Sequence, residues 1–128
     1  MIEQDLDPDI SSTIKRLPGV LPHRSSGSSW GGLAFALASS RRKDVGMPDQ
    51  ARLALERLDV LLSELGAVRT GILHATVFLA DLQHKSDFDE AWAAWIGSDP
   101  QGWPSRACVA VTLTPGTLCE ISVIAARG

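Results

Sequence analysis

Apolar residues along the chain follow a strand period in some segments and a helical period in others, which predicts seven elements. Strands are predicted at residues 13–17, 30–38, 72–79, 106–113 and 118–126, and helices at residues 48–65 and from Ser86 onward. This order suits one domain of the α/β (α+β) class, with a mixed sheet and both helices packed on one face. The other face of the sheet would remain exposed to solvent in a monomer. Oligomerisation through this face is the simplest way to bury it.

The strand at residues 30–38 and the loop between the last two strands can be described more closely. In residues 30–38 the side chains of Leu33, Phe35 and Leu37 share one strand face, with alanines opposite, and the polar residues 23–29 before them resemble a turn. Residues 114–117 (TPGT) resemble a four-residue loop that joins the last two strands as a hairpin. In that hairpin Arg106 lies roughly 16 Å along the ladder from Glu120. Either a bulge reshapes the strand, or the two residues meet across a subunit boundary.

Length and charge limit the possible functions of the chain. We expect residues 1–12 to be a mobile segment and residues 13–128 to be the folded domain. The formal net charge is −3, and the Lys and Arg residues are spread along the chain rather than gathered in a basic stripe. Both features disfavour nucleic-acid binding. No apolar run approaches the roughly 20 residues that span a bilayer, and the start of the chain is polar. These features predict a soluble cytoplasmic protein without membrane contact.

Arg106 and Glu120 are the chemically informative residues, because each places an ionised side chain in a strand that otherwise reads as buried. Desolvating such a group is costly unless it has a partner or a function. The alternatives without a catalytic role are that Arg106 is a surface or interface arginine and that Glu120 is a structural ion-pair partner. Cys108 and Cys119 are expected to be reduced and buried, since two cysteines form no disulfide framework. His74 and His84 have no third ligand at a suitable spacing, so no metal site is predicted.

Three segments together resemble one known family. Residues 76–82 (TVFLADL), 104–109 (PSRACV) and 119–125 (CEISVIA) are similar in order and spacing to motifs of the RidA (YjgF-like) enamine and imine deaminases. The resemblance runs from about Leu17 to the end and is that of a divergent branch. It implies a chorismate-mutase-like fold, a homotrimer, and active sites in the clefts between subunits. The implied reaction hydrolyses 2-aminoacrylate-like enamines or imines to 2-keto acids and ammonia, without metal or organic cofactor.

The resemblance also implies roles for individual residues. Arg106 would bind the substrate carboxylate, the main chain of Cys108 would help to fix the substrate, and Glu120 would orient or deprotonate the attacking water. The chain departs from the family at residues 37–40 (LASS), where many members have SGQ, and at Arg24, where they have a tyrosine. Arg24 and Ser39 would therefore form the far wall of the pocket and favour a second anionic group, or Arg24 is a solvated turn residue. Trp103, beside the motif, is a further candidate for the pocket lining.

Three functions remain open from the sequence. The first is an imine deaminase that uses Arg106 and Glu120. The second is a non-catalytic trimer that binds a small carboxylate in the same cleft. The third, an endoribonuclease, is disfavoured by the acidic charge balance and by the absence of a His-Lys or His-Glu arrangement.

Overall fold

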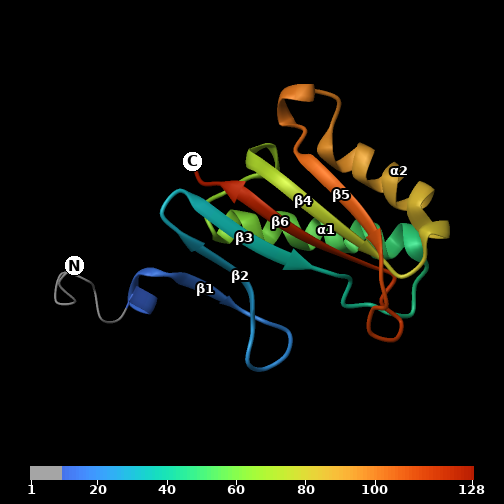
Figure 1. Cartoon of the computed structure of the whole chain (residues 1–128), viewed down its shortest axis with the longest axis horizontal. Coiled ribbons are helices and arrows are strands. Elements are labelled where there is room, and N and C mark those ends of the chain that lie inside the picture. Colours follow the sequence, from blue (N-terminus) through green and yellow to red (C-terminus); the bar gives the residue numbers. More distant parts are fainter. Residues whose placement is uncertain (1–9) are drawn as a thin grey trace.

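A computed structural model describes residues 10–128 and shows a six-stranded sheet with two helices on one of its faces (Figure 1). The helices are α1 (Met47–Glu64) and α2 (Lys85–Ile96). The strands are β1 (Lys15–Pro18), β2 (Ser25–Trp30), β3 (Leu33–Ala38), β4 (Ile72–Leu79), β5 (Ser105–Ala110) and β6 (Cys119–Ala126). Their order in the sheet is β1-β2-β3-β6-β4-β5, and only the β4–β5 pair is parallel.

Several predictions of the sequence are confirmed: the mixed sheet, the two helices on one face, strand β4 over residues 72–79, and both helices within two residues of their expected starts. Most of the segment predicted to be mobile, residues 1–12, lies outside the described residues, and Ile10–Thr13 form a short 3-10 helix. Within residues 10–128, neither helix combines the length and the apolar character needed to cross a bilayer.

The assignment of residues 23–29 to a turn is wrong, because β2 occupies Ser25–Trp30. The expected single strand over residues 30–38 is instead the second half of a hairpin, which turns at Gly31 and Gly32. Gly31 has a φ of 58°, which a glycine adopts without strain. Strand β2 could not be predicted from apolar alternation because its residues are mainly serines. One of them, Ser26, is buried, and its hydroxyl donates to the carbonyl of Pro18 (2.8 Å).

The predicted hairpin between the last two strands is also wrong, because β4 lies between β5 and β6. Residues 114–117 do form a turn, in which the amide of Thr117 donates to the carbonyl of Thr114 (3.0 Å). The loop is held by Gln50 of α1, a buried side chain whose amide donates to the carbonyl of Gly116 (2.9 Å) and accepts from the amide of Leu118 (3.0 Å). The turn predicted at residues 114–117 is therefore present, but a turn does not determine which strands pair in the sheet.

The core lies between the sheet and α1. Ala34, Ala36 and Ala38 of β3 are buried and small, which allows the helix to approach the sheet closely. The large buried side chains are supplied by α1, α2, β4 and β6, among them Leu55, Leu58, Leu62, Phe88, Val77, Leu79, Ile121 and Val123.

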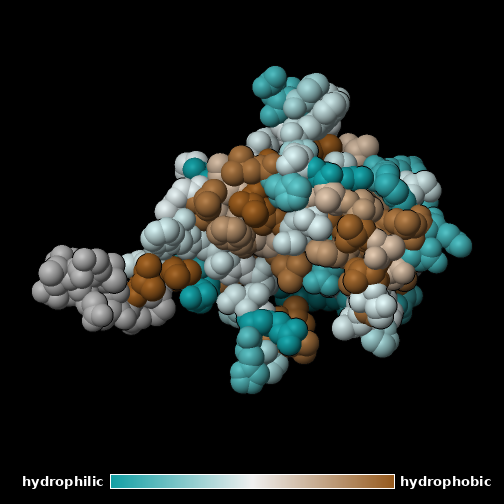
Figure 2. Space-filling view, in the orientation of Figure 1, coloured by the Kyte–Doolittle hydropathy of each residue, from teal (hydrophilic) through white to brown (hydrophobic). Residues whose placement is uncertain are grey.

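The second face of the sheet is not covered by any described part of the chain. Leu33, Phe35 and Leu37 point to it with 40%, 41% and 41% of their surface exposed. Figure 2 shows hydrophobic side chains gathered over this sheet in the view of Figure 1. We call this surface the open face; its large apolar side chains are typical of a surface that meets another chain.

Candidate functional site

Arg106 lies near the start of edge strand β5 and points to the helical side of the sheet. Its register partner on β4 is Ala75, which is fully buried beneath the helices. One guanidinium nitrogen, Nη2, donates to Oδ1 of Asp89 on α2 at 2.6 Å. The guanidinium carbon also lies 5.7 Å and 5.2 Å from the ring centroids of Phe88 and Trp92. With 19% of its side chain exposed, Arg106 is held between β5 and α2 rather than extended into solvent.

Asp89 has two cationic partners. Lys85, one helical turn earlier, donates to Oδ2 at 2.6 Å, while Arg106 holds Oδ1. Partial burial by itself raises the pKa of Asp89, but the hydrogen bonds from Lys85 and Arg106 outweigh that effect and hold the pKa below its ordinary value. Asp89 is therefore ionised at neutral pH, and the three groups together carry one net positive charge.

The main chain of β5 adds hydrogen-bonding groups beside Arg106. The amide of Val111, just beyond β5, donates to the carbonyl of Leu79 (2.9 Å), so the odd-numbered residues direct their peptide groups toward β4. Successive residues of a strand point to opposite sides, and the N–H and C=O groups of Arg106 and Cys108 therefore point to the free edge of the sheet. The side chain of Cys108 is half-buried against the core.

Trp103 precedes β5 and stays at the surface, with 54% of its area exposed. Its indole N–H donates to the carbonyl of Gly97 (2.8 Å) at the end of α2, which fixes the ring near the start of β5. The ring is therefore on the same edge as Arg106 and Cys108, and we call these three residues the edge group.

Glu120 lies on the opposite face of the sheet from Arg106. It pairs in register with Phe78 of β4, and both are half-buried on the open face. Because β4 separates β5 from β6 and the two side chains point to opposite faces, one protomer does not bring Arg106 and Glu120 together. The separation expected from the hairpin thus remains, although its geometric reason is different.

Arg24 and Ser39 lie at the same end of the sheet as Glu120. Ser39 follows Ala38, the register partner of Ile121, so Ser39 and Glu120 continue the β3–β6 ladder by one position each. Arg24 precedes β2 and is exposed, and its carbonyl accepts from the amide of Gly19 (3.1 Å). Arg24, Ser39 and Glu120 form a second set of residues, which we call the strand-end group.

A third arrangement, which the sequence analysis did not predict, lies on the open face. Nδ1 of His74 lies 2.8 Å from the hydroxyl of Ser105, and that hydroxyl donates to the carbonyl of Leu73 (3.1 Å). The second ring nitrogen, Nε2, lies 3.4 Å from the hydroxyl of Thr76. Only the parallel β4–β5 register places His74 opposite Ser105, and that register was not visible in the sequence.

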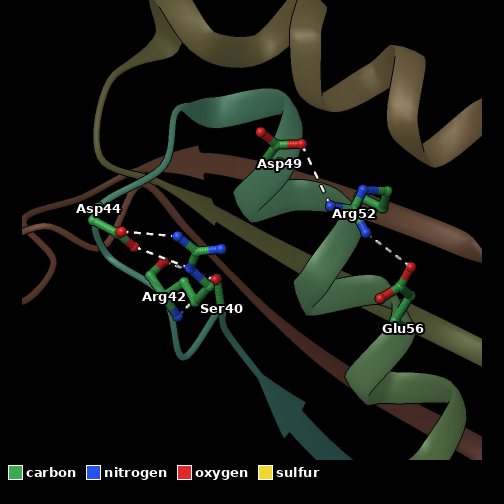
Figure 3. Close-up of polar contacts among 6 residues, drawn as sticks. All are labelled: Ser40, Arg42, Asp44, Asp49, Arg52 and Glu56. Atoms are coloured by element: carbon green, nitrogen blue, oxygen red, sulfur yellow. Dashed lines mark hydrogen bonds and ion pairs between the residues drawn. The ribbon is translucent and has the colours of Figure 1, made fainter.

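Two surface hollows lie on the helical side, on either side of α1. A groove between α1 and α2 has a volume of about 660 Å³ and is lined by Asp49, Glu56, Asp59, Asp87 and Glu90 together with Arg52, Arg69 and apolar residues. A smaller hollow of about 280 Å³ lies between α1 and residues 39–42. Figure 3 shows the ion pairs of Arg52 with Asp49 and Glu56 and of Arg42 with Asp44. Asp49, Arg52 and Glu56 line the groove, and Arg42 and Glu56 line the smaller hollow. The lining of neither hollow includes Arg106 or Glu120.

Among residues 10–128, no three His, Cys, Asp or Glu side chains are grouped so that they could hold a metal ion. The arrangement offers instead a guanidinium, a set of free peptide groups and a carboxylate, which suit an anionic organic substrate.

Comparison with known proteins places these residues in a wider context. Residues 31–127 match the protein family described as Endoribonuclease L-PSP. The chain is 36% identical over 78 residues to a RutC family protein of Haemophilus influenzae, a match that covers 60% of this chain and 66% of that relative. It is 27% identical to TdcF of Escherichia coli, named a reactive intermediate deaminase, over 88% of this chain and 93% of TdcF. It is 30% identical to a 2-iminobutanoate/2-iminopropanoate deaminase of Bos taurus, over 77% and 70% of the two chains.

Solved structures show the same fold. A member of the YjgF protein family from Neisseria meningitidis superposes with a TM-score of 0.82 at 25% identity, over 90% of this chain and 95% of that one. Escherichia coli TdcF with bound serine superposes with a TM-score of 0.78 at 27% identity, over 88% and 94% of the two chains.

Proposed function

Because this chain belongs to the Endoribonuclease L-PSP family, which includes the YjgF proteins, we propose that it hydrolyses small 2-imino or enamino acids to 2-keto acids and ammonia. The observation that carries the proposal is the half-buried guanidinium of Arg106 at a strand edge whose peptide groups are free. A guanidinium fork matches a carboxylate, and the peptide groups of Cys108 can orient the rest of the substrate. The names of TdcF and of the bovine relative support the same reaction class.

The reaction needs one water and no electron transfer. An enamino acid first tautomerises to the imine by gaining a proton at carbon and losing one from nitrogen. The water oxygen attacks the carbon of the C=N bond, and the π electrons move to nitrogen, which takes up a proton. The resulting carbinolamine gains a second proton at nitrogen and expels ammonia while its hydroxyl loses a proton, which leaves the 2-keto acid. In the proposed site Arg106 binds the substrate carboxylate and Glu120 accepts a proton from the attacking water. The hydrolysis is therefore a matter of binding, orientation and proton transfer by this chain's own residues.

The two residues come together, in this proposal, where subunits of a homotrimer meet. They lie on opposite faces of the sheet in one protomer, so the edge group of one subunit must face the strand-end group of the next. The apolar open face supplies surface that such an assembly would bury. Light scattering at micromolar concentration should give three times the chain mass of 13.7 kDa. A monomer under those conditions contradicts the shared site.

A second function, ligand binding without chemistry, is favoured by the ion pair that already engages Arg106. A guanidinium paired with Asp89 can still bind a carboxylate through its remaining N–H donors. Escherichia coli TdcF, a relative with the same fold, has been solved with bound serine, a small carboxylate. This candidate uses the same cleft but assigns no role in proton transfer to Glu120.

Ammonia release from an imine generated by an amino-acid oxidase separates the two functions. The deaminase predicts that the wild-type protein accelerates ammonia release and that Arg106→Ala abolishes the acceleration, whereas Arg16→Ala, an exposed arginine of β1, leaves it unchanged. No acceleration by the wild-type protein, together with calorimetric binding of pyruvate that Arg106→Ala removes, would identify the binder. RNA cleavage that survives Arg106→Ala would instead support the third function, an endoribonuclease.

A further inference from the structure

The smaller surface hollow is lined mainly by positive charge. Its walls are residues 39–42, which follow β3, and one exposed side of α1. Arg41, Arg42 and Arg57 line it together with one carboxylate, Glu56, while Leu53 and Val60 form an apolar part of the wall. We call this region the arginine hollow. In a chain with a net charge of −3, such a concentration of guanidinium groups around one hollow is unexpected.

The nearby carboxylates are already used. Arg42 holds Asp44 through two hydrogen bonds of 3.2 Å and 2.8 Å, and Arg52 holds Glu56 at 3.1 Å (Figure 3). Between residues 10 and 128, no carboxylate oxygen lies within the 4.0 Å of an ion pair from Arg41 or Arg57. These two guanidinium groups therefore face the hollow without a direct ion-pair partner, since Glu56 is engaged by Arg52 and Glu64 acts on Arg57 only from beyond ion-pair distance.

Arg57 is held in an unfavourable electrostatic environment. Burial lowers the pKa of its guanidinium and the positive charge of Arg41 lowers it further, while the negative charge of Glu64 offsets part of this effect. Both groups remain charged at neutral pH, because an arginine is not deprotonated in proteins. An anion placed between them would remove the repulsion and replace lost hydration with charge-assisted hydrogen bonds.

Ser39 adds a polar group at the same hollow. The ammonium of Lys43 donates to its hydroxyl oxygen at 3.4 Å, which leaves the hydroxyl proton of Ser39 free to be donated. The hollow thus combines two guanidinium forks and a hydroxyl donor with an apolar wall, within a volume of about 280 Å³.

We propose that the arginine hollow binds a phosphate monoester, with the phosphate between Arg41 and Arg57 and the organic group against Leu53 and Val60. A phosphate has enough oxygens to accept from two guanidinium forks and a hydroxyl at the same time, whereas a single carboxylate has only two oxygens. This site lies outside the edge and strand-end groups except for Ser39, and it does not depend on the proposed deaminase reaction.

Calorimetric titration of the full-length protein with inorganic phosphate and with phenyl phosphate, at constant ionic strength, tests the site. We expect saturable binding of both, with phenyl phosphate the tighter ligand because its ring contacts the apolar wall. Arg57→Gln and Arg41→Gln should each weaken binding by about tenfold or more. Arg16→Gln, which removes the same charge from exposed strand β1, should leave binding unchanged.

Three outcomes would overturn the proposal: no saturable binding of either ligand by the wild-type protein, undiminished binding by Arg57→Gln and Arg41→Gln, or equal weakening by Arg16→Gln. The last result would show attraction by net charge rather than a site. Circular dichroism checks that the variants are folded. If Arg57→Gln is not, Arg41→Gln decides, because Arg41 lies on an exposed loop segment where substitution leaves the core intact.

Discussion

The guanidinium of Arg106 and the carboxylate of Asp89 form an ion pair of 2.6 Å that ties edge strand β5 to helix α2. The arginine that the proposed reaction needs for its substrate thus already has an anionic partner. A substrate carboxylate must either use the remaining N–H donors of Arg106 or replace Asp89. Asp89 is therefore both a support for the position of Arg106 and a competitor for its charge.

Removing the charge of Asp89 should strengthen the binding of small carboxylates. We expect Asp89→Asn to lower the Kd for pyruvate by about fivefold, because an ion pair that is still partly open to solvent is worth about 1 kcal/mol. Calorimetry measures the change, and Asp87→Asn on the same helix is the matched control. A Kd that rises in Asp89→Asn would show that the ion pair positions Arg106 more than it competes with the ligand.

The same ion pair should make stability depend on pH in the acid range. The pKa of Asp89 is lowered in the folded protein from its ordinary value of 3.8, so the folded state binds the proton less readily than the unfolded state. The stabilisation is present above about pH 4 and is lost as the pH falls through the lower folded pKa. Urea unfolding should therefore show wild type more stable than Asp89→Asn at pH 6 and a smaller difference near pH 3. An equal difference at both pH values contradicts this assignment.

The two cysteines should react at very different rates. Burial raises the pKa of the Cys119 thiol to about 11 and also blocks access to it, whereas Cys108 is only half-buried at the sheet edge. Brief treatment of the folded protein with iodoacetamide should modify Cys108 first, and mass spectrometry of peptides can measure both sites. Both cysteines should react after denaturation. Modification of Cys119 as fast as Cys108 in the folded protein would contradict the described packing of β6.

Gln50 should contribute strongly to stability, since its buried amide holds the loop before β6. Gln50→Met keeps a similar volume but leaves the amide of Leu118 and two carbonyl groups without their partner. We expect a loss of about 2 kcal/mol in the free energy of unfolding. Urea denaturation measures it, with the exposed Gln101→Met as the control. A loss no larger than that of the control would mean that water satisfies these groups.

How far the sequence predicted the fold depends on the kind of signal. Elements with strong periodicity, such as α1 and β4, were predicted because burial on one face fixes their pattern. Strand β2 was missed because its serines do not alternate with apolar residues. The position of β4 between β5 and β6 was missed because a turn such as residues 114–117 does not determine which strands pair.

For the candidate site, the sequence suggests individual residues but not the residues that they contact. Arg106 and Glu120 are candidates from the sequence because charges in apolar strands need an explanation, and their part in the reaction stays a prediction. Their partners could not be identified, since Asp89 meets Arg106 only through the packing of α2, and His74 meets Ser105 only through the parallel register of β4 and β5. Such contacts depend on tertiary structure and cannot be predicted from the local pattern of apolar and polar residues.

The central claim is that Arg106 of one subunit and Glu120 of another form one active site. Subunit mixing tests it most directly: Arg106→Ala and Glu120→Gln are each inactive alone, and they are then unfolded together and refolded in equal amounts. If neighbouring subunits share each site, random assembly restores about a quarter of the wild-type rate of ammonia release, because that share of interfaces combines an intact Arg106 with an intact Glu120. If both residues served one site within a single subunit, every site would keep a defect and no activity would return.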